Sequence, residues 1–249
     1  TQQPNPKAIG EKQAAERLGS VVRGRARARP DARSNATLGS RREGSGVIID
    51  DRGYILTIGY LVIEADAIEV TTAQGKTSPA TLAAYDHATG FGLLRAVLPL
   101  GAKPIDLGTS AELALREPVL VAPYGGRELV NLAQVVSTRQ FAGSWEYLLD
   151  SAIFISPPTF AWAGSALISR EGKLVGIGSL LVRDSEEVGT PLPGNMFVPI
   201  DLLKPILADL IDQGRVSGPP RPWLGMSTEE LQGRLFVTRV SPEAPADAA

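Results

Sequence analysis

The sequence predicts an all-β protein built from many short strands. Glycine and proline are abundant, with 26 and 19 copies in 249 residues, a share well above the usual figure of about 12%. Short runs rich in Val, Ile, Leu and Thr lie between these turn-forming residues. From Val22 to Arg29, small or apolar residues alternate with arginines, which is the period of two expected of a half-buried strand.

The composition excludes several classes of protein. With no cysteine and one histidine, the chain cannot be a disulfide scaffold or hold a Cys-ligated or multi-His metal site. Its 25 basic and 27 acidic residues give a net charge of -2, which does not favour a nucleic-acid partner. The longest uncharged stretch, residues 151–169, contains two prolines and is a poor membrane helix. We expect no metal, no cofactor, no nucleic acid and no membrane span.

The N-terminal half predicts an arm followed by six strands. Residues 1–19 are polar and contain no aromatic residue, so we expect an arm with a short helix near Glu11 to Leu18. A first strand runs from Ser20 until Pro30 ends its pairing. We interpret its arginine row as a solvent-exposed face, because the rest of the chain has no basic footprint. The other strands expected in residues 20–104 are 46–49, 54–57, 67–72, 80–85 and 91–97. Six strands suffice for a small barrel.

Residues 105–199 contain a second, similar set of strand patterns. The expected strands are 118–122, 130–140, 152–155, 165–169, 173–181 and 195–199. A helix is predicted over 201–213, within a C-terminal helical segment 200–215, because leucines and isoleucines recur there at helical spacing. Asp201 can cap its start and Gly214 can follow its last turn. Residues 216–222 form a Pro-rich linker, and 223–249 begin a new unit with a strand at Arg234–Val240.

Three stretches resemble a known protein family in their order and spacing. They are the hairpin from Gly44 to Thr57, the run Pro199–Leu202, and the run Arg221–Gly225. Together they are similar to the HtrA/DegP family of trypsin-like serine proteases over about residues 20–249. The resemblance implies two six-stranded β-barrels of the chymotrypsin type at 20–104 and 105–199, then the helix, and then a partial PDZ domain at 223–249.

The resemblance also implies that the catalytic triad is absent. The family's histidine, aspartate and serine fall on Tyr60, Gly90 and Ala163. Acyl transfer needs a nucleophile, a base with a pKa near 7 and a group that orients the base. An alanine, a phenol with a pKa of about 10 and a glycine supply none of these. The oxyanion-hole equivalents would be Ala161, Trp162 and Ala163, with Ala161 in place of a glycine. We therefore expect no catalytic residues and interpret the chain as a pseudoprotease.

A protease scaffold without its triad keeps its binding surfaces. By resemblance, Ile177, Gly178 and Ser179 line the substrate cleft, where an extended peptide can add to the strand edge. The stretch Trp223-Leu224-Gly225-Met226 resembles the PDZ loop that receives a peptide C-terminal carboxylate. The expected partners are therefore polypeptide segments or peptide C-termini. The family resemblance implies a periplasmic location, with a signal peptide already removed because the chain begins with Thr.

Two other functions remain open from the sequence. One is a serine endopeptidase with an active centre rebuilt on Ser165 or Thr159, for which His87 is the one available imidazole. The other is a structural subunit that assembles with itself or with an active relative. The residues alone favour binding without turnover, since Ser165 lies two positions past the nucleophile site and His87 three positions before Gly90.

Overall fold

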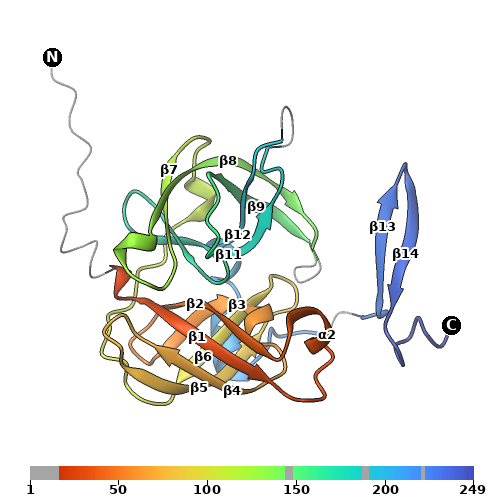
Figure 1. Ribbon diagram of the computed structural model, residues 1–249, viewed down its shortest axis with the longest axis horizontal. Coiled ribbons are helices and arrows are strands. Elements are labelled where there is room, and N and C mark those ends of the chain that lie inside the picture. Colours follow the sequence, from red (N-terminus) through yellow and green to blue (C-terminus); the bar gives the residue numbers. More distant parts are fainter. Residues whose placement is uncertain (1–16, 144–147, 187–190, 220–221) are drawn as a thin grey trace. The chain divides into compact units, whose positions relative to one another are not determined.

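The computed structural model describes residues 17–143, 148–186, 191–219 and 222–249. The chain divides into two compact units, the first ending at Val216 and the second running from Ser217 to Ala249. The predicted helix near Glu11 to Leu18 lies outside the described residues except for its last two positions. The first unit contains two closed β-barrels of six strands each (Figure 1). The predicted all-β, double-barrel fold is confirmed.

The first barrel is formed by the N-terminal strands. They are β1 (Val21–Ala28), β2 (Arg41–Ile48), β3 (Tyr54–Ile58), β4 (Ala65–Thr71), β5 (Thr77–Tyr85) and β6 (Phe91–Ala96), in the order β1-β2-β3-β6-β5-β4. All neighbouring strands are antiparallel. Val22, Ile55, Val70 and Leu94 are buried and line the barrel interior. The burial of their apolar side chains stabilises the barrel.

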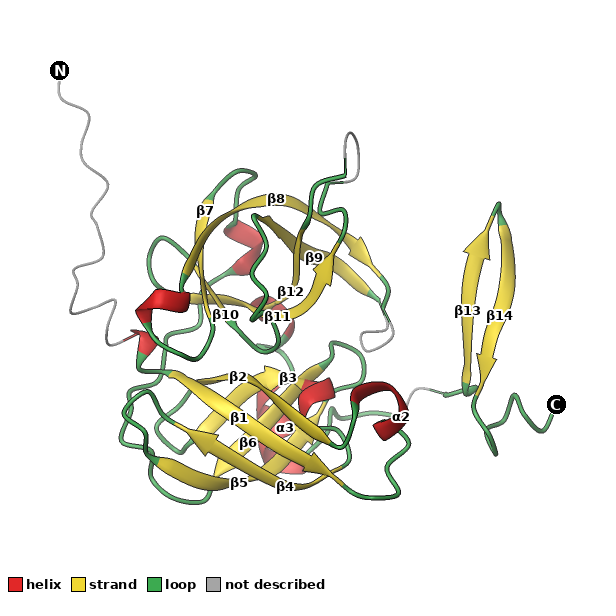
Figure 2. Cartoon of the chain, viewed as in Figure 1, coloured by secondary structure: helices red, strands yellow, loops and turns green. Residues whose placement is uncertain are grey.

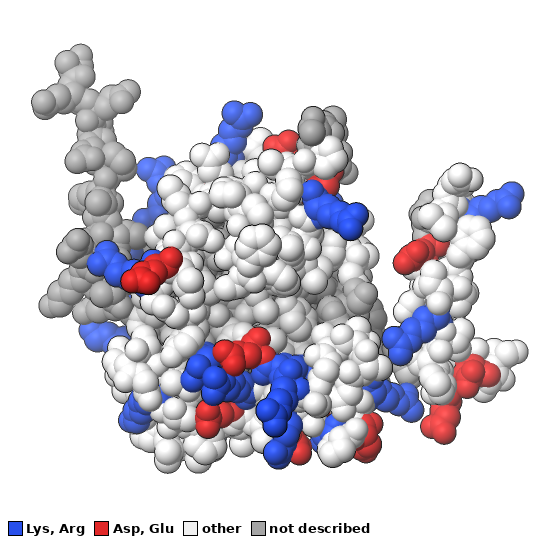
Figure 3. All heavy atoms as spheres, viewed as in Figure 1, with Lys and Arg blue, Asp and Glu red and all other residues white. Residues whose placement is uncertain are grey.

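Two arginines of the β1 row are solvent-exposed as expected, whereas the third, Arg23, is half-buried over the Tyr124 ring. Ala26 and Ala28 are buried, whereas Arg25 and Arg27 are exposed. Arg25 pairs with Glu43 at 2.9 Å and Arg27 with Asp66 at 3.2 Å. Figure 3 shows basic and acidic side chains intermixed over this barrel. The row is therefore largely neutralised by carboxylates on neighbouring strands.

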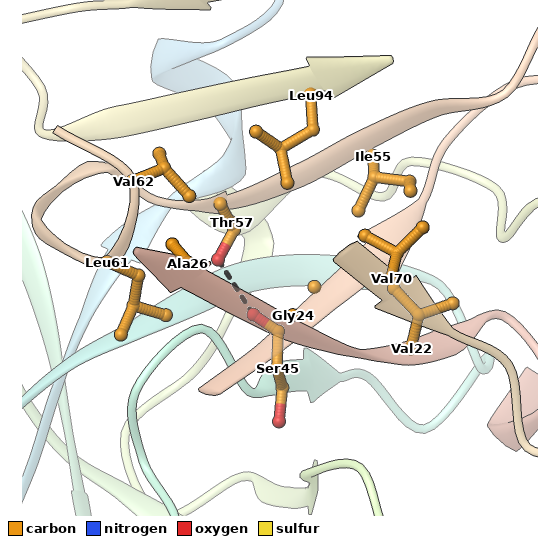
Figure 4. Close-up of a pocket in the computed structure, with 11 residues that line it drawn as sticks. Val22, Gly24, Ala26, Ser45, Ile55, Thr57, Leu61, Val62, Val70 and Leu94 are labelled. Atoms are coloured by element: carbon orange, nitrogen blue, oxygen red, sulfur yellow. Dashed lines mark hydrogen bonds between the residues drawn. The ribbon is translucent and has the colours of Figure 1, made fainter. Parts of the chain in front are cut away.

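The interior of the first barrel contains a small cavity of about 10 Å³ (Figure 4). Its lining is apolar apart from Thr57 and Ser45. The Thr57 hydroxyl donates a 2.7 Å hydrogen bond to the Ser45 carbonyl oxygen, so this buried polar pair is satisfied. A space of this size holds at most one water molecule, and it is a packing void rather than a ligand site.

The second barrel follows the same plan. Its strands are β7 (Pro118–Ala122), β8 (Asn131–Phe141), β9 (Leu149–Ser156), β10 (Ala166–Ile168), β11 (Leu174–Val182) and β12 (Gly194–Pro199), in the order β10-β11-β12-β9-β8-β7. Val121, Ile155, Leu167 and Phe197 are buried in its core. The two barrels contact one another through β2 and β3 on one side and β10 and β11 on the other. The predicted site residues of both barrels lie at this junction.

The C-terminal helix is shorter than the sequence predicts. A 3₁₀ turn, η4 (Ile200–Leu202), comes first, and α3 runs only from Leu207 to Gln213. Pro205 has no N–H to donate and interrupts the helical ladder. Asp201 does not cap the helix, because its carboxylate accepts hydrogen bonds from the Ala111 amide and the Lys204 ammonium group. Gly214 ends α3 in the left-handed conformation, as expected, and α3 packs against β5 (Figure 2).

In the described part of the chain, four other short helices connect the strands, and the sequence did not predict them. They are α2 (Asn35–Leu38), η1 (Gly59–Leu61), η2 (Ser110–Glu112) and η3 (Arg127–Leu129). Each has only three or four residues, too few to show a hydrophobic period. Among the described residues, no helix has the length and apolar content needed to cross a membrane.

The second unit is a two-stranded antiparallel hairpin. It consists of β13 (Met226–Leu231) and β14 (Arg234–Val240), the latter with the predicted bounds. Gln232 and Gly233 connect the strands with φ angles of 53° and 72°, as a tight hairpin turn requires. Leu235, Phe236 and Val237 are exposed. An isolated hairpin with an apolar surface is marginally stable alone.

Candidate functional site at the barrel junction

The segments that carry Tyr60 and Gly90 lie side by side at one end of the first barrel. Strand β3 ends at Ile58 and continues into η1, where the Gly59 amide donates a 2.7 Å hydrogen bond to the Gly90 carbonyl. A Cβ at Gly59 would overlap the Tyr85 ring, so a glycine is needed for this close approach. Gly90 itself has a φ of 82°, in the region that favours glycine.

A buried arginine holds the segment that carries Tyr60. The Arg42 side chain, on β2, donates to the carbonyl oxygens of Tyr60 at 3.2 Å and Ile63 at 2.7 Å. It also donates to the Ser34 hydroxyl at 2.7 Å, and Ser34 in turn donates to the Glu64 carboxylate. Burial lowers the pKa of Arg42, opposed by the Glu64 charge, but a guanidinium remains protonated. This network could not be predicted from the sequence, because its members share no local motif.

The loop that carries Ala163 rests on the first barrel. The Ala163 carbonyl accepts a 2.9 Å hydrogen bond from the Ser45 amide. Gly164 has a φ of 72°, and a Cβ there would overlap the Ser45 carbonyl oxygen. A Cβ at Gly44 would lie 2.8 Å from the Ala163 carbonyl oxygen. The backbones of this loop and β2 are therefore in direct contact, which places Ala163 at the barrel junction.

The backbone around Ala161 and Trp162 forms hydrogen bonds within its own loop. The Ala161 amide donates to the Thr159 hydroxyl oxygen at 3.3 Å. The Trp162 carbonyl accepts from the Ser165 amide at 3.0 Å and from the Ser165 hydroxyl at 2.8 Å. Ala161 is not among the residues with positive φ, so its Cβ causes no backbone strain. The amide expected at the oxyanion position thus already has an acceptor.

The predicted cleft residues of β11 are buried and paired. Ile177 is paired with Ala166 on one side and with Val198 on the other. The Gly178 amide donates to the Ser165 carbonyl, and the Gly178 carbonyl accepts from the Gly164 amide, both at 2.9 Å. Ile177 and Gly178 therefore offer no open edge to a peptide. On β11, exposure begins further along, at Leu181 with 41%.

One hydrogen bond joins the two barrels at their predicted sites. The Tyr60 hydroxyl donates to the Ser179 carbonyl oxygen at 2.6 Å. Tyr60 is 9% exposed and Ser179 is completely buried, so solvent does not compete strongly for the acceptor. The structure thus brings Tyr60, Gly90, Ala163 and Ser179 into one region.

Asn195, on β12, is a site residue that the sequence analysis missed. Its completely buried amide accepts from the Thr159 amide at 2.7 Å and donates to the Thr159 carbonyl at 3.1 Å. It also donates to the Leu180 carbonyl at 3.4 Å. Asn195 therefore bridges the loop before Ala161 and the outer part of β11. A lone asparagine in a strand carries no sequence signal for this role.

The alternative nucleophiles lie in unfavourable surroundings. Ser165 is completely buried, and its hydroxyl is bonded to the Trp162 carbonyl. Thr159 is 5% exposed and bridged by Asn195. The His87 ring packs edge-on against Tyr85, 4.3 Å between centroids. Burial lowers the pKa of His87, opposed by the Asp86 charge. In the part of the chain that the structure describes, no hydrogen bond joins His87 to either hydroxyl, and no cluster of acidic or histidine side chains could hold a metal ion.

The predicted carboxylate loop belongs to the second unit. Gly225 has a φ of 75°, and a Cβ there would overlap the Ala244 side chain. Its carbonyl accepts from the Ser241 amide at 2.7 Å, and the Leu224 carbonyl accepts from Ala246 at 2.9 Å. Trp223 is 51% exposed, so it is not a buried linker residue. The loop is a folded turn around Gly225.

Sequence comparison identifies the family of this double barrel. Residues 44–177, more than half of the chain, match the trypsin-like peptidase domain. This chain belongs to the HtrA-type trypsin-like peptidases. It is 28% identical to the serine endoprotease DegS of Escherichia coli K12 over 86% of its own length. It is 30% identical to the serine protease PepD of Mycobacterium tuberculosis over 83%.

Solved structures show the same HtrA-type fold. The HtrA-type protease AlgW, with a bound tripeptide, matches 94% of this chain and 78% of the AlgW chain, with a TM-score of 0.65 and 21% identity. This HtrA-type chain covers 63% of DegS and 49% of PepD. It therefore spans between about half and two thirds of these relatives.

Proposed function

We propose that this HtrA-type chain is proteolytically inactive and binds polypeptide segments without cleaving them. The observation that carries the proposal is the set of side chains at Tyr60, Gly90 and Ala163. A phenol bonded to Ser179, a bare glycine and a methyl group replace the base, the orienting carboxylate and the nucleophile that acyl transfer requires.

The surrounding geometry supports binding without turnover. A transition-state oxyanion needs backbone donors directed at it, whereas the Ala161 amide donates to Thr159. Ser165 is also poorly placed to act as a replacement nucleophile. Its hydroxyl is buried and donates a hydrogen bond to the Trp162 carbonyl. The absence of a second histidine in the sequence leaves His87, which packs on Tyr85, as the one imidazole.

The second unit is the better candidate for the peptide-binding surface. At the barrel junction, the backbone groups of Gly178 are already bonded and Ser179 accepts from Tyr60. By contrast, the loop from Trp223 to Met226 precedes a hairpin with exposed apolar side chains. We propose that this loop begins a PDZ-type domain and receives peptide C-termini through its backbone amides. Structures of the neighbour AlgW with a tripeptide and a decapeptide fit this proposal.

We also propose a periplasmic location. Two similar proteins bear names that include the words probable periplasmic serine endoprotease, from Hahella chejuensis and Marinomonas. Fractionation of the native host, with a periplasmic and a cytoplasmic marker protein, tests this location. Recovery of the protein with the cytoplasmic marker would overturn it.

Peptide binding is tested by fluorescence anisotropy with labelled peptides, added to the native full-length protein. We expect peptides with a free C-terminal carboxylate to bind and amidated peptides to bind at least tenfold more weakly, by loss of a charge-assisted interaction. Mass spectrometry of the same mixtures should show intact peptide. Equal affinity for both peptide forms, or peptide cleavage, would contradict the proposal.

A glycine pair supplies a matched control. Gly225 and Gly233 have φ angles of 75° and 72°, but a Cβ overlaps a neighbour only at Gly225 and meets nothing within 4 Å at Gly233. We expect Gly225→Ala to abolish peptide binding and Gly233→Ala to preserve it. Loss of binding in both variants, or in neither, would remove the carboxylate loop from the proposal.

A further inference from the structure

A separate pocket of about 370 Å³ lies on the second barrel. Its apolar lining includes Leu120 from β7, Val130 between η3 and β8, and Ile168 from β10. Two arginines, Arg17 and Arg127, complete it. The volume lies within the usual range for small-molecule sites, roughly 300–1000 Å³. None of the residues of the cleft at the barrel junction lines this pocket.

Arg17 lines this pocket, and one of its guanidinium donors is unsatisfied. Its guanidinium packs directly over Gly172, where a Cβ would overlap it. The Nη1 atom is buried and has no hydrogen-bond partner among the described residues. A buried charged donor without an acceptor is energetically costly. Nη1 itself is covered by Gly172, but an anion bound elsewhere on the same guanidinium would offset the cost through its charge.

The charge around the pocket favours an anion. Arg127 provides a second, exposed guanidinium from η3, and none of the described residues that line the pocket is acidic. The carboxylate closest to Gly172 in sequence, Glu171, pairs with Lys173 at 3.3 Å. Guanidinium groups bind carboxylates through paired N–H donors.

We propose that this pocket binds an aliphatic monocarboxylate. The carboxylate would bind Arg17, with Arg127 beside it, and the alkyl chain would lie among Leu120, Val130 and Ile168. A monoanion suits the site better than a phosphate dianion, because the remaining lining is apolar and desolvation of a second charge would be unfavourable. The aliphatic side chains favour an alkyl body by burial of apolar area.

The test uses isothermal titration calorimetry with octanoate, octan-1-ol and octylammonium, each below its aggregation concentration. We expect octanoate to bind at least tenfold more tightly than octan-1-ol, and octylammonium to bind most weakly because of the two cations. Equal affinity for octanoate and octan-1-ol, or no octanoate binding at millimolar concentration, would overturn the proposal.

Substitutions locate the bound ligand. Arg17→Gln should lower octanoate affinity about tenfold and leave octan-1-ol binding unchanged. Arg183→Gln, an exposed arginine of the same barrel outside the pocket, is the control and should leave both unchanged.

A second pair of variants tests the apolar part. Val130→Phe should fill the pocket and abolish octanoate binding, whereas Val97→Phe, at an exposed position outside it, should not. Thermal unfolding of each variant confirms that it is folded. Full octanoate affinity in folded Arg17→Gln or Val130→Phe would overturn the assignment.

Discussion

The Tyr60 hydroxyl donates a 2.6 Å hydrogen bond to the Ser179 carbonyl oxygen, across the junction between the two barrels. The two residues are 119 positions apart in the chain. Tyr60 lies at the position where an HtrA-type protease is expected to carry its catalytic base. Its phenol group forms a hydrogen bond between the two barrels. The same bond engages a backbone carbonyl of β11.

Removal of the Tyr60 hydroxyl should destabilise the protein. We expect Tyr60→Phe to lower the free energy of unfolding by about 1–2 kcal/mol, because the buried Ser179 carbonyl loses this donor. Urea denaturation measures the change. Tyr54→Phe is the matched control, since Tyr54 is also buried and its hydroxyl has no hydrogen-bond partner among the described residues. An equal loss in both variants would show that the junction bond contributes nothing specific.

The Asn195 amide should be equally important for the loop before Ala161. Asn195→Ala removes hydrogen bonds to both backbone groups of Thr159 and to Leu180, and we expect a loss of roughly 2–3 kcal/mol. Hydrogen exchange at the Thr159 amide should accelerate at the same time. Asn131→Ala, on the partly exposed start of β8, should change neither quantity. Unchanged exchange at Thr159 in Asn195→Ala would contradict the bridging role.

Glu64 should make the stability depend on pH in the acid range. The hydrogen bond from the Ser34 hydroxyl lowers the pKa of Glu64; burial opposes this effect, and the amides of Ser34 and Arg33 and the Arg29 charge add to it. A carboxyl with a lowered folded-state pKa stabilises the fold above its unfolded pKa, about 4.3. This contribution is lost as the pH falls through the lower, folded-state value.

The variant Glu64→Gln tests this dependence. We expect it to be about 1 kcal/mol less stable than the parent at pH 7, with the difference shrinking towards zero in strong acid. Glu43→Gln, whose exposed partner is Arg25, should cost much less at any pH. A difference for Glu64→Gln that stays constant down to strong acid would contradict the assignment.

His87 should titrate below an ordinary histidine. Burial lowers its pKa and the Asp86 charge opposes this. Because the sequence contains one histidine, its imidazole protons can be followed by NMR without assignment. The unfolded chain binds the proton more readily, so stability should decline as the pH falls from about 6.5 towards the folded-state pKa. A midpoint at or above 6.5 would contradict this prediction.

Much of the barrel architecture could be predicted from local patterns. The alternation in β1 and the turn at residues 50–53 between β2 and β3 are local signals, and both elements form as predicted. The C-terminal helix was predicted too long, because its leucine spacing continues through Pro205, where the structure has turns. The spacing of hydrophobic residues does not reveal that Pro205 lacks the backbone N–H that a helix needs.

Only the parts of the site that lie in sequence motifs could be predicted. Motifs placed Tyr60, Gly90 and Ala163 in segments that the fold brings together. The contacts of Arg42 and Asn195 could not be predicted, because each depends on backbone groups contributed by distant segments. The sequence likewise did not predict that the backbone groups of Gly178 are bonded to residues 164 and 165. These hydrogen bonds occupy the edge that was expected to be open at Ile177 and Gly178.

The most direct test of the account is reaction of the native full-length protein with a fluorophosphonate probe, in parallel with casein digestion. We expect neither labelling nor cleavage, because the proposed function leaves the barrel junction without an activated nucleophile. Labelling and cleavage that both disappear in Ser165→Ala would show that the active centre has been rebuilt, and would contradict the assignment of this chain as an inactive HtrA-type protein.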